Sequence, residues 1–255
     1  MKEPITVTLE KLSEGPYTSV LCYPKPCQEE VQSRLEELRS HSVTAIEFSG
    51  KTQAQGIPGP IIGKGYAGVV VVAHMNGQRV ALKILRVDAD RPDLLHEARM
   101  LQKANSVNVG PKLVGASKNF LLTQLIDGDL LPQWLELHRE RELMRHVLGE
   151  VLANCCRLDE IGLDHGELSK APKHVIIDHA QKPWLLDFET SSDMRKPANV
   201  TAICHFLFSS LGEVARTVEQ TLGERNKELI LKVLRNYKIA RTRENFGEVL
   251  RACLG

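Results

Sequence analysis

A glycine-rich stretch is the first part of this sequence that could do chemistry. Gly63-Lys64-Gly65-Tyr66-Ala67-Gly68-Val69 has the spacing G-x-G-x-x-G-x-V. Glycines at this spacing let backbone N–H groups approach an anion without hindrance from a Cβ. A dinucleotide-binding site requires a helix after the glycines, whereas here a run of valines and the hairpin dipeptide Asn76-Gly77 follow. The stretch therefore predicts a β-hairpin loop that cradles phosphates, with an ordinary tight turn as the alternative.

A lysine and a glutamate further along the chain could act on the same anion. In the next predicted strand the two-residue period puts Lys83 on the same face as Ala81, and a small residue beside a lysine leaves room for an adenine ring. On the following predicted helix, Glu97 lies in line with Leu94 and Leu101 and so faces inward. A buried carboxylate requires a cation, and Lys83 is the candidate. The alternatives are a solvated lysine and a solvated helix-surface glutamate.

Two acids in the second half of the chain could share a metal and phosphate site. Glu167 lies within His165-Gly166-Glu167-Leu168-Ser169, and Asp187 follows a short predicted strand within Leu185-Leu186-Asp187-Phe188-Glu189. One acid could orient a hydroxyl group or a water, and the other could hold Mg²⁺ against phosphates. Taken singly, each acid could instead be a turn or strand-end residue that hydrogen-bonds to the backbone.

The elements that must position these residues divide the chain into a β-rich part and a helical part. Before residue 127 the patterns predict strands at 17–23, 43–48, 69–73, 79–85, 113–114 and 120–126, and helices around 31–38 and 91–104. Asp90 is the expected cap of the second helix. Later we expect one helix over 134–161, strands at 175–177 and 184–186, and three helices between 199 and 254, broken near Gly223 and at 238–242.

The order of these motifs resembles the protein-kinase-like superfamily. The glycine loop, Val80-Ala81-Leu82-Lys83, the helix glutamate, the His165–Ser169 stretch and Asp187-Phe188 follow one another as they do there. The His165–Ser169 stretch is most similar to that of the small RIO-type kinases, atypical serine/threonine protein kinases of prokaryotic type. The resemblance covers about residues 60–190. It implies an α+β, two-lobed fold: an extension at 1–55 that packs on the N-lobe, a β-rich N-lobe with one helix at 56–126, and a reduced, mainly helical C-lobe with a catalytic-type loop at 127–255.

The resemblance also implies that ATP binds in the cleft between the lobes. Lys83 would bind the α- and β-phosphates and pair with Glu97, Asp187 would ligate Mg²⁺ or Mn²⁺, and Glu167 would orient the acceptor hydroxyl. The ammonium of Lys83 and the carboxylate of Asp187 would then converge on one triphosphate. The residues expected to bind ATP are Gly63, Lys64, Gly65, Gly68, Ala81, Lys83, Gln124 and Ile126, the last two through their backbone at the hinge.

Three positions depart from the family pattern. Glu167 stands where the family has an aspartate and is one methylene longer. Pro172 occupies the position of the usual metal-binding asparagine; if two residues are inserted, His174 takes that place, and imidazole suits Mn²⁺ better than Mg²⁺. Glu189 replaces the glycine of D-F-G and could add a second carboxylate near the metal.

Together these features predict transfer of the ATP γ-phosphoryl group to a serine or threonine hydroxyl of a protein substrate, which the sequence does not identify. Two alternatives stay open. A small-molecule phosphotransferase would be favoured if the helices after Asn199 enclosed a compact acidic acceptor pocket. A nucleotide-binding scaffold, or pseudokinase without turnover, is favoured by the departures at Glu167, Pro172 and Glu189.

Composition and charge exclude several other classes of protein. The chain is 42% hydrophobic and 25% charged, which is close to the globular average and excludes a disordered, collagen-like or disulfide-scaffold protein. A net charge of +1 gives no bulk attraction to nucleic acid or anionic lipid, so neither is an expected partner. The longest apolar run is far shorter than the roughly 20 residues of a membrane span, Met1–Pro4 lacks a secretory start, and the sparse cysteines suit reduced thiols. We therefore expect a cytoplasmic protein.

Overall fold

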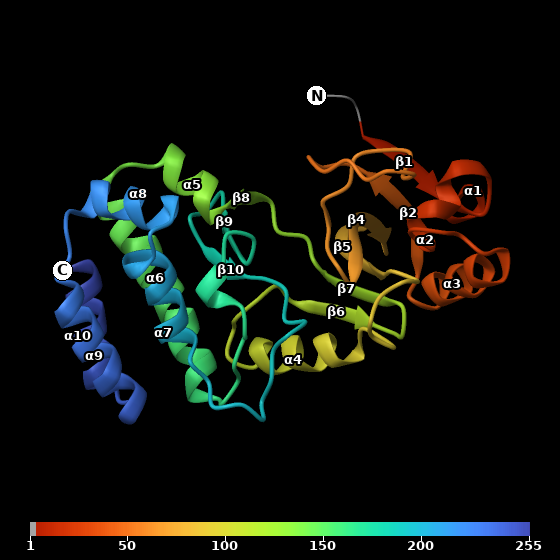
Figure 1. The fold of residues 1–255 in the computed structure, drawn as a ribbon. Coiled ribbons are helices and arrows are strands. Elements are labelled where there is room, and N and C mark those ends of the chain that lie inside the picture. Colours follow the sequence, from red (N-terminus) through yellow and green to blue (C-terminus); the bar gives the residue numbers. More distant parts are fainter. Residues whose placement is uncertain (1–3) are drawn as a thin grey trace. The chain divides into compact units, whose positions relative to one another are not determined.

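The computed structural model describes residues 4–255 and has an α+β architecture, as the sequence predicts. The chain forms two compact units (Figure 1). The first comprises the described residues up to Arg99 together with Lys112–Leu125, and the second comprises Met100–Pro111 and Ile126–Gly255. Residues 1–3 of the expected extension lie outside the described part. Among the helices of residues 4–255, none combines the length and the apolar character that a bilayer crossing requires.

A seven-stranded antiparallel sheet forms the centre of the first unit. The strand order is β1-β2-β4-β5-β7-β6, with β3 paired to β4. The predicted Asn76-Gly77 hairpin is present: both residues have positive φ, 50° and 74°, as a two-residue turn of type I′ requires. The strands are β1 (Ile5–Thr8), β2 (Val43–Phe48), β3 (Gly63–Lys64), β4 (Gly68–Met75), β5 (Gln78–Leu85), β6 (Leu113–Ala116) and β7 (Phe120–Gln124).

Helices from the N-terminal segment pack against this sheet and bury its apolar side. The core contains the inward residues of α3, Val69 and Val71 of β4, and Leu82 and Ile84 of β5. Because β2 pairs with β4, residues before the glycine loop belong to the same sheet as that loop. The helical segments are α1 (Leu9–Leu12), η1 (Gly15–Tyr17), α2 (Thr18–Leu21), α3 (Gln28–Ser40) and α4 (Leu95–Asn105).

Two sequence predictions for the first unit are wrong. Residues 17–23 do not form a strand: the hydroxyls of Thr18 and Ser19 donate to the carbonyls of Gly15 and Pro16, and these local bonds hold the chain in helical turns. Helix α4 begins at Leu95 rather than near residue 91. The side chain of Asp93, not that of Asp90, accepts from the Leu95 N–H at 2.9 Å.

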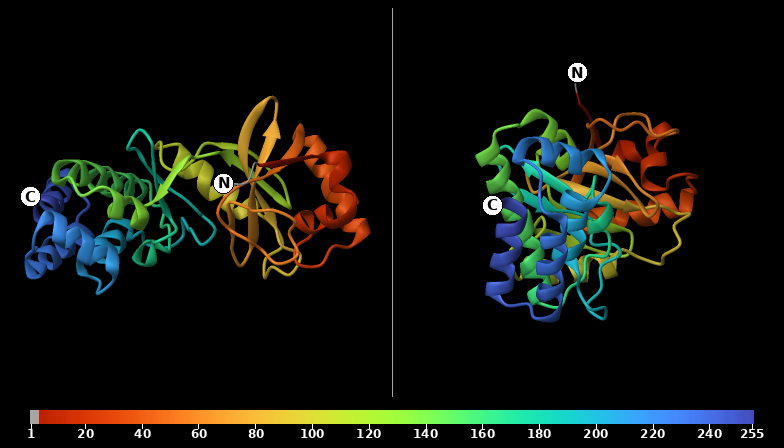
Figure 2. Two further views of the ribbon diagram at one scale, coloured as in Figure 1. Left: turned by 90° about the horizontal axis from the view of Figure 1, so that it is seen from above. Right: turned by 60° about the vertical axis from the view of Figure 1, so that its left-hand side comes forward.

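The second unit consists of helices and a three-stranded antiparallel sheet in the order β10-β9-β8. Helices α6, α9 and α10 lie side by side (Figures 1 and 2). The strands are β8 (Gly128–Leu130), β9 (Val175–Asp178) and β10 (Pro183–Leu185). The helical segments are α5 (Leu131–Leu137), α6 (Arg141–Glu160), η2 (Leu168–Lys170), α7 (Asn199–Cys204), the π-helical η3 (His205–Ser209), α8 (Glu213–Leu222), α9 (Lys227–Ile239) and α10 (Arg243–Leu254).

The helical part contains more breaks than the sequence predicts. The helix expected over 134–161 is two helices, because the backbone at His138 and Glu140 is extended. The region after Asn199 has the expected breaks near Gly223 and residues 240–242, but also a third one where Ser210 and Gly212 are extended. Hydrophobic periodicity runs through such short interruptions and does not reveal them.

Candidate functional site

The glycine loop is a narrow antiparallel hairpin between β3 and β4. The N–H of Gly65 donates to the carbonyl of Gly68 at 2.8 Å and closes the loop. A Cβ added at Gly63 would meet no atom within 4 Å, and one at Gly65 would meet only the Gly68 carbonyl at 3.9 Å. Neither residue has positive φ. The fold itself therefore does not require glycine at these two positions, and the space left open suits the close approach of a ligand phosphate.

Gly68, by contrast, is required by the side chain of Lys83. A Cβ at Gly68 would lie 2.9 Å from Cγ of Lys83, which is closer than real contacts of this kind, and at the tight distances of 3.1 Å from the Ile84 carbonyl oxygen and 3.2 Å from Cε of Lys83. The lysine therefore runs directly over the Gly68 backbone. This contact depends on the β4–β5 register, in which Lys83 is opposite Val70.

The predicted pair of Lys83 and Glu97 is present. The ammonium Nζ lies 2.7 Å from Oε2 of Glu97, and the two side chains are 13% and 5% exposed. Glu97 occupies the first turn of α4, where its neighbours Leu94 and Ala98 pack into a small core with Leu85 and Leu121. Burial of these apolar neighbours fixes the helix face, and Glu97 is thereby directed toward β5.

The other residues expected to contact ATP in the first unit have mixed environments. Ala81 lies opposite Thr123 on β7 and is partly buried on the Lys83 face. Gln124 already uses its N–H, which donates to the Lys112 carbonyl at 2.8 Å, so a hinge contact by this residue would have to use its carbonyl. Lys64 donates to the Tyr23 hydroxyl at 3.2 Å. Ile126 is the first residue of the adjoining segment of the second unit.

In the second unit, three of the expected residues form a cluster. Glu167, His174 and Asp187 each place one potential metal-ligand atom within 4.8 Å of those of the other two. Glu167 precedes η2, His174 precedes β9, and Asp187 follows β10. The antiparallel β9–β10 pairing brings the second and third residues to the same end of the hairpin, where the N–H of Leu186 donates to the His174 carbonyl at 2.9 Å.

Backbone geometry marks Asp187 within this cluster. Its φ is +65°, a left-handed conformation that costs an ordinary L-residue roughly 1–2 kcal/mol. Such conformations persist where the surroundings impose them, and they concentrate at functional sites. Gly166 is also constrained, at φ +92°, because a Cβ there would lie 2.8 Å from both Arg195 and Thr190.

His165 holds the loop of Glu167 against the loop of Asp187. Its Nε2 donates to the Leu186 carbonyl at 3.0 Å, and its ring lies 5.1 Å from the ring of Phe188 and 5.7 Å from that of His174. Burial, aided by the neighbouring His174, lowers the pKa of His165 to about 4. The imidazole is therefore neutral at physiological pH, with its proton on Nε2, and the buried Nδ1 has no hydrogen-bond partner.

A second layer of buried polar groups fixes His165 in turn. Its backbone N–H donates to Oδ1 of Asn199 at 2.8 Å, while the Asn199 side-chain amide donates to Asp159 at 2.8 Å and to the Leu163 carbonyl at 2.7 Å. The Tyr237 hydroxyl also donates to Asp159, at 3.2 Å. Burial raises the pKa of Asp159 despite these bonds. No local sequence pattern predicts this network, because Asp159, Asn199 and Tyr237 come from three different helices, α6, α7 and α9.

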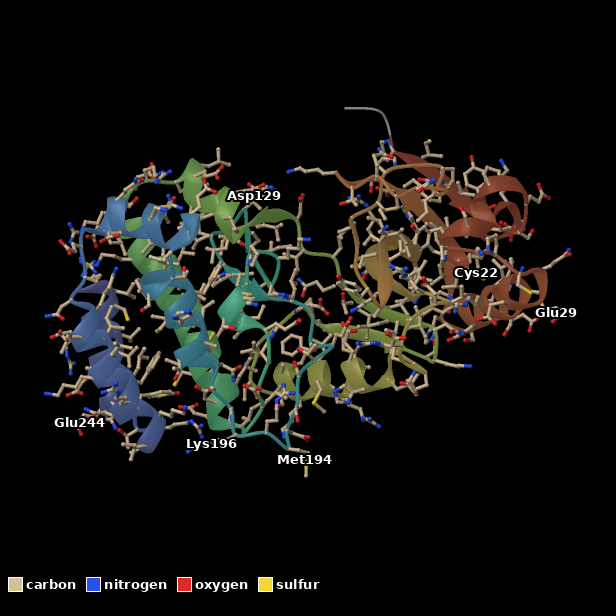
Figure 3. The ribbon with its side chains drawn as sticks, viewed as in Figure 1. Cys22, Glu29, Asp129, Met194, Lys196 and Glu244 are labelled. Atoms are coloured by element: carbon tan, nitrogen blue, oxygen red, sulfur yellow. The ribbon has the colours of Figure 1, made fainter. Side chains whose placement is uncertain are left out.

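Phe188 links Asp187 to the second part of α4. A Cβ at Gly110, where φ is +77°, would lie 2.9 Å from both Leu101 and Phe188, so the phenyl ring and Leu101 both pack against this glycine. After Phe188 the chain is held by Asp164, which binds Arg195 at 2.9 Å and exchanges backbone bonds with Ser192. In the same segment the side chain of Met194 points outward and is 91% exposed (Figure 3).

The ligand atoms of the cluster fit a divalent cation, and its carboxylate oxygens fit better than its imidazole nitrogen. Glu167 and Asp187 offer carboxylate oxygens, the ligands that Mg²⁺ and Mn²⁺ prefer. His174 fits less well: its Nε2 lies 3.7 Å from Glu167, beyond hydrogen-bond distance, and its buried Nδ1 has no hydrogen-bond partner. A metal-bound imidazole ordinarily donates its other N–H to an acceptor. Glu189, the additional carboxylate suggested by the sequence, is partly buried two residues beyond Asp187.

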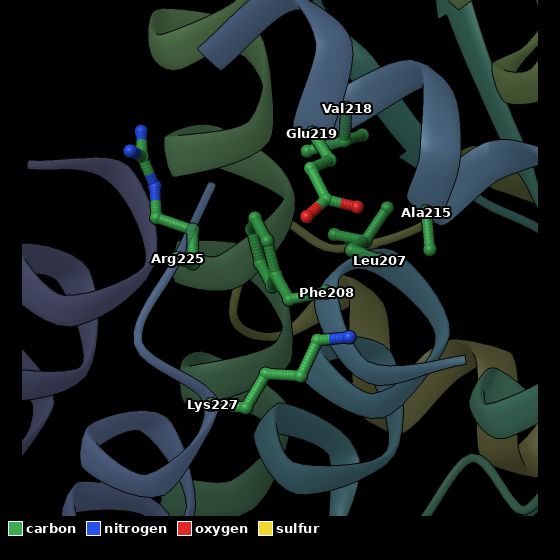
Figure 4. A pocket seen from close by; sticks show the side chains of 7 residues that line it. All are labelled: Leu207, Phe208, Ala215, Val218, Glu219, Arg225 and Lys227. Atoms are coloured by element: carbon green, nitrogen blue, oxygen red, sulfur yellow. The ribbon is translucent and has the colours of Figure 1, made fainter. Parts of the chain in front are cut away.

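A cavity between η3 and α8 is too small to serve as an acceptor site. It has a volume of about 10 Å³, which is room for one water, and it is lined by Leu207, Phe208, Ala215, Val218, Glu219, Arg225 and Lys227 (Figure 4). Glu219 is the one acid among these residues, beside two cations. This cavity is not the compact acidic pocket that a small-molecule phosphotransferase would need.

All six cysteines lie in the described part of the chain and are free thiols, in agreement with the expectation from their spacing. Cys155 and Cys156 are buried neighbours on α6, and burial raises the pKa of both. Neither therefore has the thiolate character of a nucleophile.

No protein-family model matches the chain, and no curated protein matches it.

Proposed function

We propose that this chain is an ATP-dependent phosphotransferase of protein-kinase-like fold that transfers the γ-phosphoryl group to a serine or threonine hydroxyl of a protein. The observation that carries the proposal is the buried Lys83–Glu97 ion pair, with the lysine lying over Gly68 of the glycine loop. A pair with this little exposure is hard to explain by stability alone, because apolar residues of similar volume are often equally stabilising.

Each unit supplies one part of the proposed chemistry. In the first, the backbone of Gly63, Gly65 and Gly68 cradles phosphates, and Lys83, oriented by Glu97, binds the α- and β-phosphates. In the second, Asp187 offers an oxygen ligand to a divalent cation, which would neutralise phosphate charge, and Glu167 orients the acceptor hydroxyl. Three features support these roles: the ion pair of Lys83, the open space at Gly63 and Gly65, and the cluster that contains Glu167 and Asp187.

The proposed reaction is an in-line displacement at phosphorus. The acceptor hydroxyl oxygen bonds to the γ-phosphorus, the bond from that phosphorus to the β–γ bridging oxygen breaks, and ADP leaves with the bond's electron pair. The hydroxyl proton passes to the carboxylate of Glu167. The backbone of Glu167, at φ −123° and ψ 7°, lies near the bridge region that active-site residues often adopt, which agrees with this role.

A single-turnover experiment tests the proposal. The protein is mixed with γ-labelled ATP and either Mg²⁺ or Mn²⁺, nucleotide binding is measured in parallel, and labelled residues are mapped by mass spectrometry. We expect ATP binding and label on serine or threonine in the wild type, with transfer lost in Asp187→Asn and Glu167→Gln. Absence of ATP binding under both metals would contradict the proposal.

A nucleotide-binding scaffold without turnover is the second candidate. The specific observation in its favour is His174, whose ring nitrogens lack both a hydrogen bond to Glu167 and an outer partner of the kind that supports a metal-bound imidazole. The same experiment separates the two functions. ATP binding with no label transfer under either metal would favour the scaffold.

A further inference from the structure

A tyrosine from the N-terminal segment lies against the glycine loop. Tyr23 follows α2 and is 8% exposed. Its carbonyl accepts from the N–H of Val87 at 3.0 Å, which ties this segment to the residues that leave β5. This bond fixes the backbone from which the ring projects beside the residues that follow β5.

Two cations of the first unit lie on this ring. Nζ of Lys64 donates to the Tyr23 hydroxyl at 3.2 Å and lies 5.1 Å from the ring centroid. The Arg86 guanidinium carbon lies 5.3 Å from the same centroid. Both distances are within the range of cation–π attraction. One aromatic ring thus contacts a residue of the loop and a residue that follows β5.

Arg86 extends this contact to the loop backbone. Its Nη1 donates to the Gly65 carbonyl at 3.0 Å, and its own N–H donates to the Ala67 carbonyl at 2.9 Å. Asp88 holds the guanidinium through two bonds, of 2.7 and 2.8 Å. The glycine loop is consequently held through the side chain of Lys64 and through two bonds from Arg86, and Tyr23 contacts the side chains of both residues.

The loop needs such ties because of its composition. Glycine loses more backbone freedom on ordering than any other residue, and each residue fixed costs roughly 1–2 kcal/mol. A loop already ordered before its ligand arrives does not incur that cost on binding. Tyr66 at the tip is 96% exposed and gives the loop no packing of its own.

We infer that Tyr23 is a positioning residue that orders the glycine loop for nucleotide phosphates, so that the N-terminal segment forms part of the nucleotide-binding apparatus. The nucleotide in this inference rests on the proposed function, whereas the ordering of the loop does not. Loss of the Tyr23 ring raises the KM for ATP and leaves kcat nearly unchanged, since Tyr23 acts through the loop and not on the reacting atoms.

The test compares Tyr23→Leu and Tyr23→Phe with a matched control, Tyr17→Leu. Tyr17 belongs to the same segment but packs on Phe48, with ring centroids 5.9 Å apart. Amide hydrogen exchange is measured across residues 62–69 without nucleotide, and ATP affinity and kinetics are measured separately. In Tyr23→Leu we expect loop exchange to rise about tenfold and the ATP Kd and KM to rise about three- to tenfold, with kcat within about twofold of the wild type.

Tyr23→Phe keeps the ring and loses only the hydroxyl, so its exchange and affinity should lie between those of the wild type and Tyr23→Leu. The inference is overturned if Tyr23→Leu matches Tyr17→Leu in both loop exchange and ATP affinity. If Tyr23→Leu does not fold, the Phe variant decides, and wild-type values in both measurements overturn the inference. If the wild type binds no ATP, the proposed function fails, and loop exchange alone decides whether Tyr23 orders the loop.

Discussion

Lys83 on β5 donates to Glu97 on α4 at 2.7 Å, and both side chains are largely removed from solvent. The pair joins a strand of the central sheet to the first turn of the helix that follows it. The lysine also determines the residue beneath it, since its methylene chain leaves no room for a Cβ at Gly68. The residue types at positions 68, 83 and 97 therefore depend on one another.

Removing the negative charge of this pair should weaken both the fold and nucleotide binding. In Glu97→Gln the side chain keeps its shape but loses the charge-assisted hydrogen bond, so the free energy of unfolding should fall by roughly 1–3 kcal/mol. We expect the ATP Kd to rise about tenfold because Lys83 is less firmly oriented. Urea denaturation and equilibrium nucleotide binding measure the two effects.

The matched control for this substitution is Glu29→Gln. Glu29 is also a glutamate in the first turn of a helix, α3, but it is exposed and points away from the first unit (Figure 3). Loss of its charge changes the interaction with the helix dipole in the same way. Equal effects of the two substitutions would show that the Lys83–Glu97 contact has no special role.

The backbone of Asp187 allows strain and charge to be separated. At φ +65° glycine is favoured over alanine, so Asp187→Gly should be more stable to urea than Asp187→Ala by about 1 kcal/mol. Asn tolerates this conformation, and Asp187→Asn should keep roughly the wild-type stability. All three variants remove the carboxylate and should lower phosphoryl transfer by at least about a hundredfold.

The control for the Asp187 series is Asp193→Asn, at an acid in the same loop that binds Lys103 at 3.3 Å. Its transfer rate should remain within about twofold of the wild type, because a surface ion pair contributes little. If the Asp187 variants transferred phosphate as fast as Asp193→Asn, Asp187 would not hold the metal.

Local sequence patterns predict the β4–β5 hairpin and the inward face of α4 correctly. Asn76-Gly77 specifies its turn through residues that accept positive φ, and the turn sets the register that puts Lys83 opposite Val70. The inward direction of Glu97 follows from the apolar positions of one helix. Both depend on short-range rules, which a single sequence displays directly.

Other parts of the site depend on contacts between distant residues, which no local pattern reveals. Tyr23 lies in a segment whose alternating residues predict a strand, yet its helical turns and its contact with Lys64 are determined by side-chain bonds and tertiary packing. Aspartate adopts positive φ more readily than most other residues, but only the folded surroundings select Asp187 among the aspartates for this conformation. The bond from the His165 N–H to the Asn199 side chain joins a loop to the start of α7, which only the folded chain brings together.

The metal preference of the cluster should depend on His174. An amide oxygen is a harder ligand than an imidazole nitrogen, so His174→Asn should raise the ratio of the Mg²⁺-supported to the Mn²⁺-supported transfer rate by at least about threefold. Initial rates at saturating ATP with each metal give this ratio. His179→Asn is the control, since His179 is 76% exposed and lies 3.5 Å from Asp127, away from the three clustered residues. An unchanged ratio in His174→Asn would show that His174 does not influence the metal.

Acid should destabilise the fold through His165. Burial lowers its pKa from 6.5 to about 4, so as the pH falls the unfolded chain binds a proton before the folded chain does. The contribution of the neutral buried ring is complete above pH 6.5 and is lost as the pH falls toward the folded-state pKa. At one pKa unit per 1.36 kcal/mol, the loss should approach about 3 kcal/mol near pH 4.

His165→Gln isolates this contribution from that of the other titrating groups. The Gln amide can still donate to the Leu186 carbonyl, as Nε2 of His165 does at 3.0 Å, but it does not titrate. Urea denaturation of both proteins at several pH values between about 7.5 and 4.5 should therefore give free-energy curves that diverge below pH 6.5, with the wild type falling more steeply. Parallel curves would mean that His165 takes up its proton equally readily in the folded and unfolded chains, and that its ring does not hold the two loops together as a neutral donor.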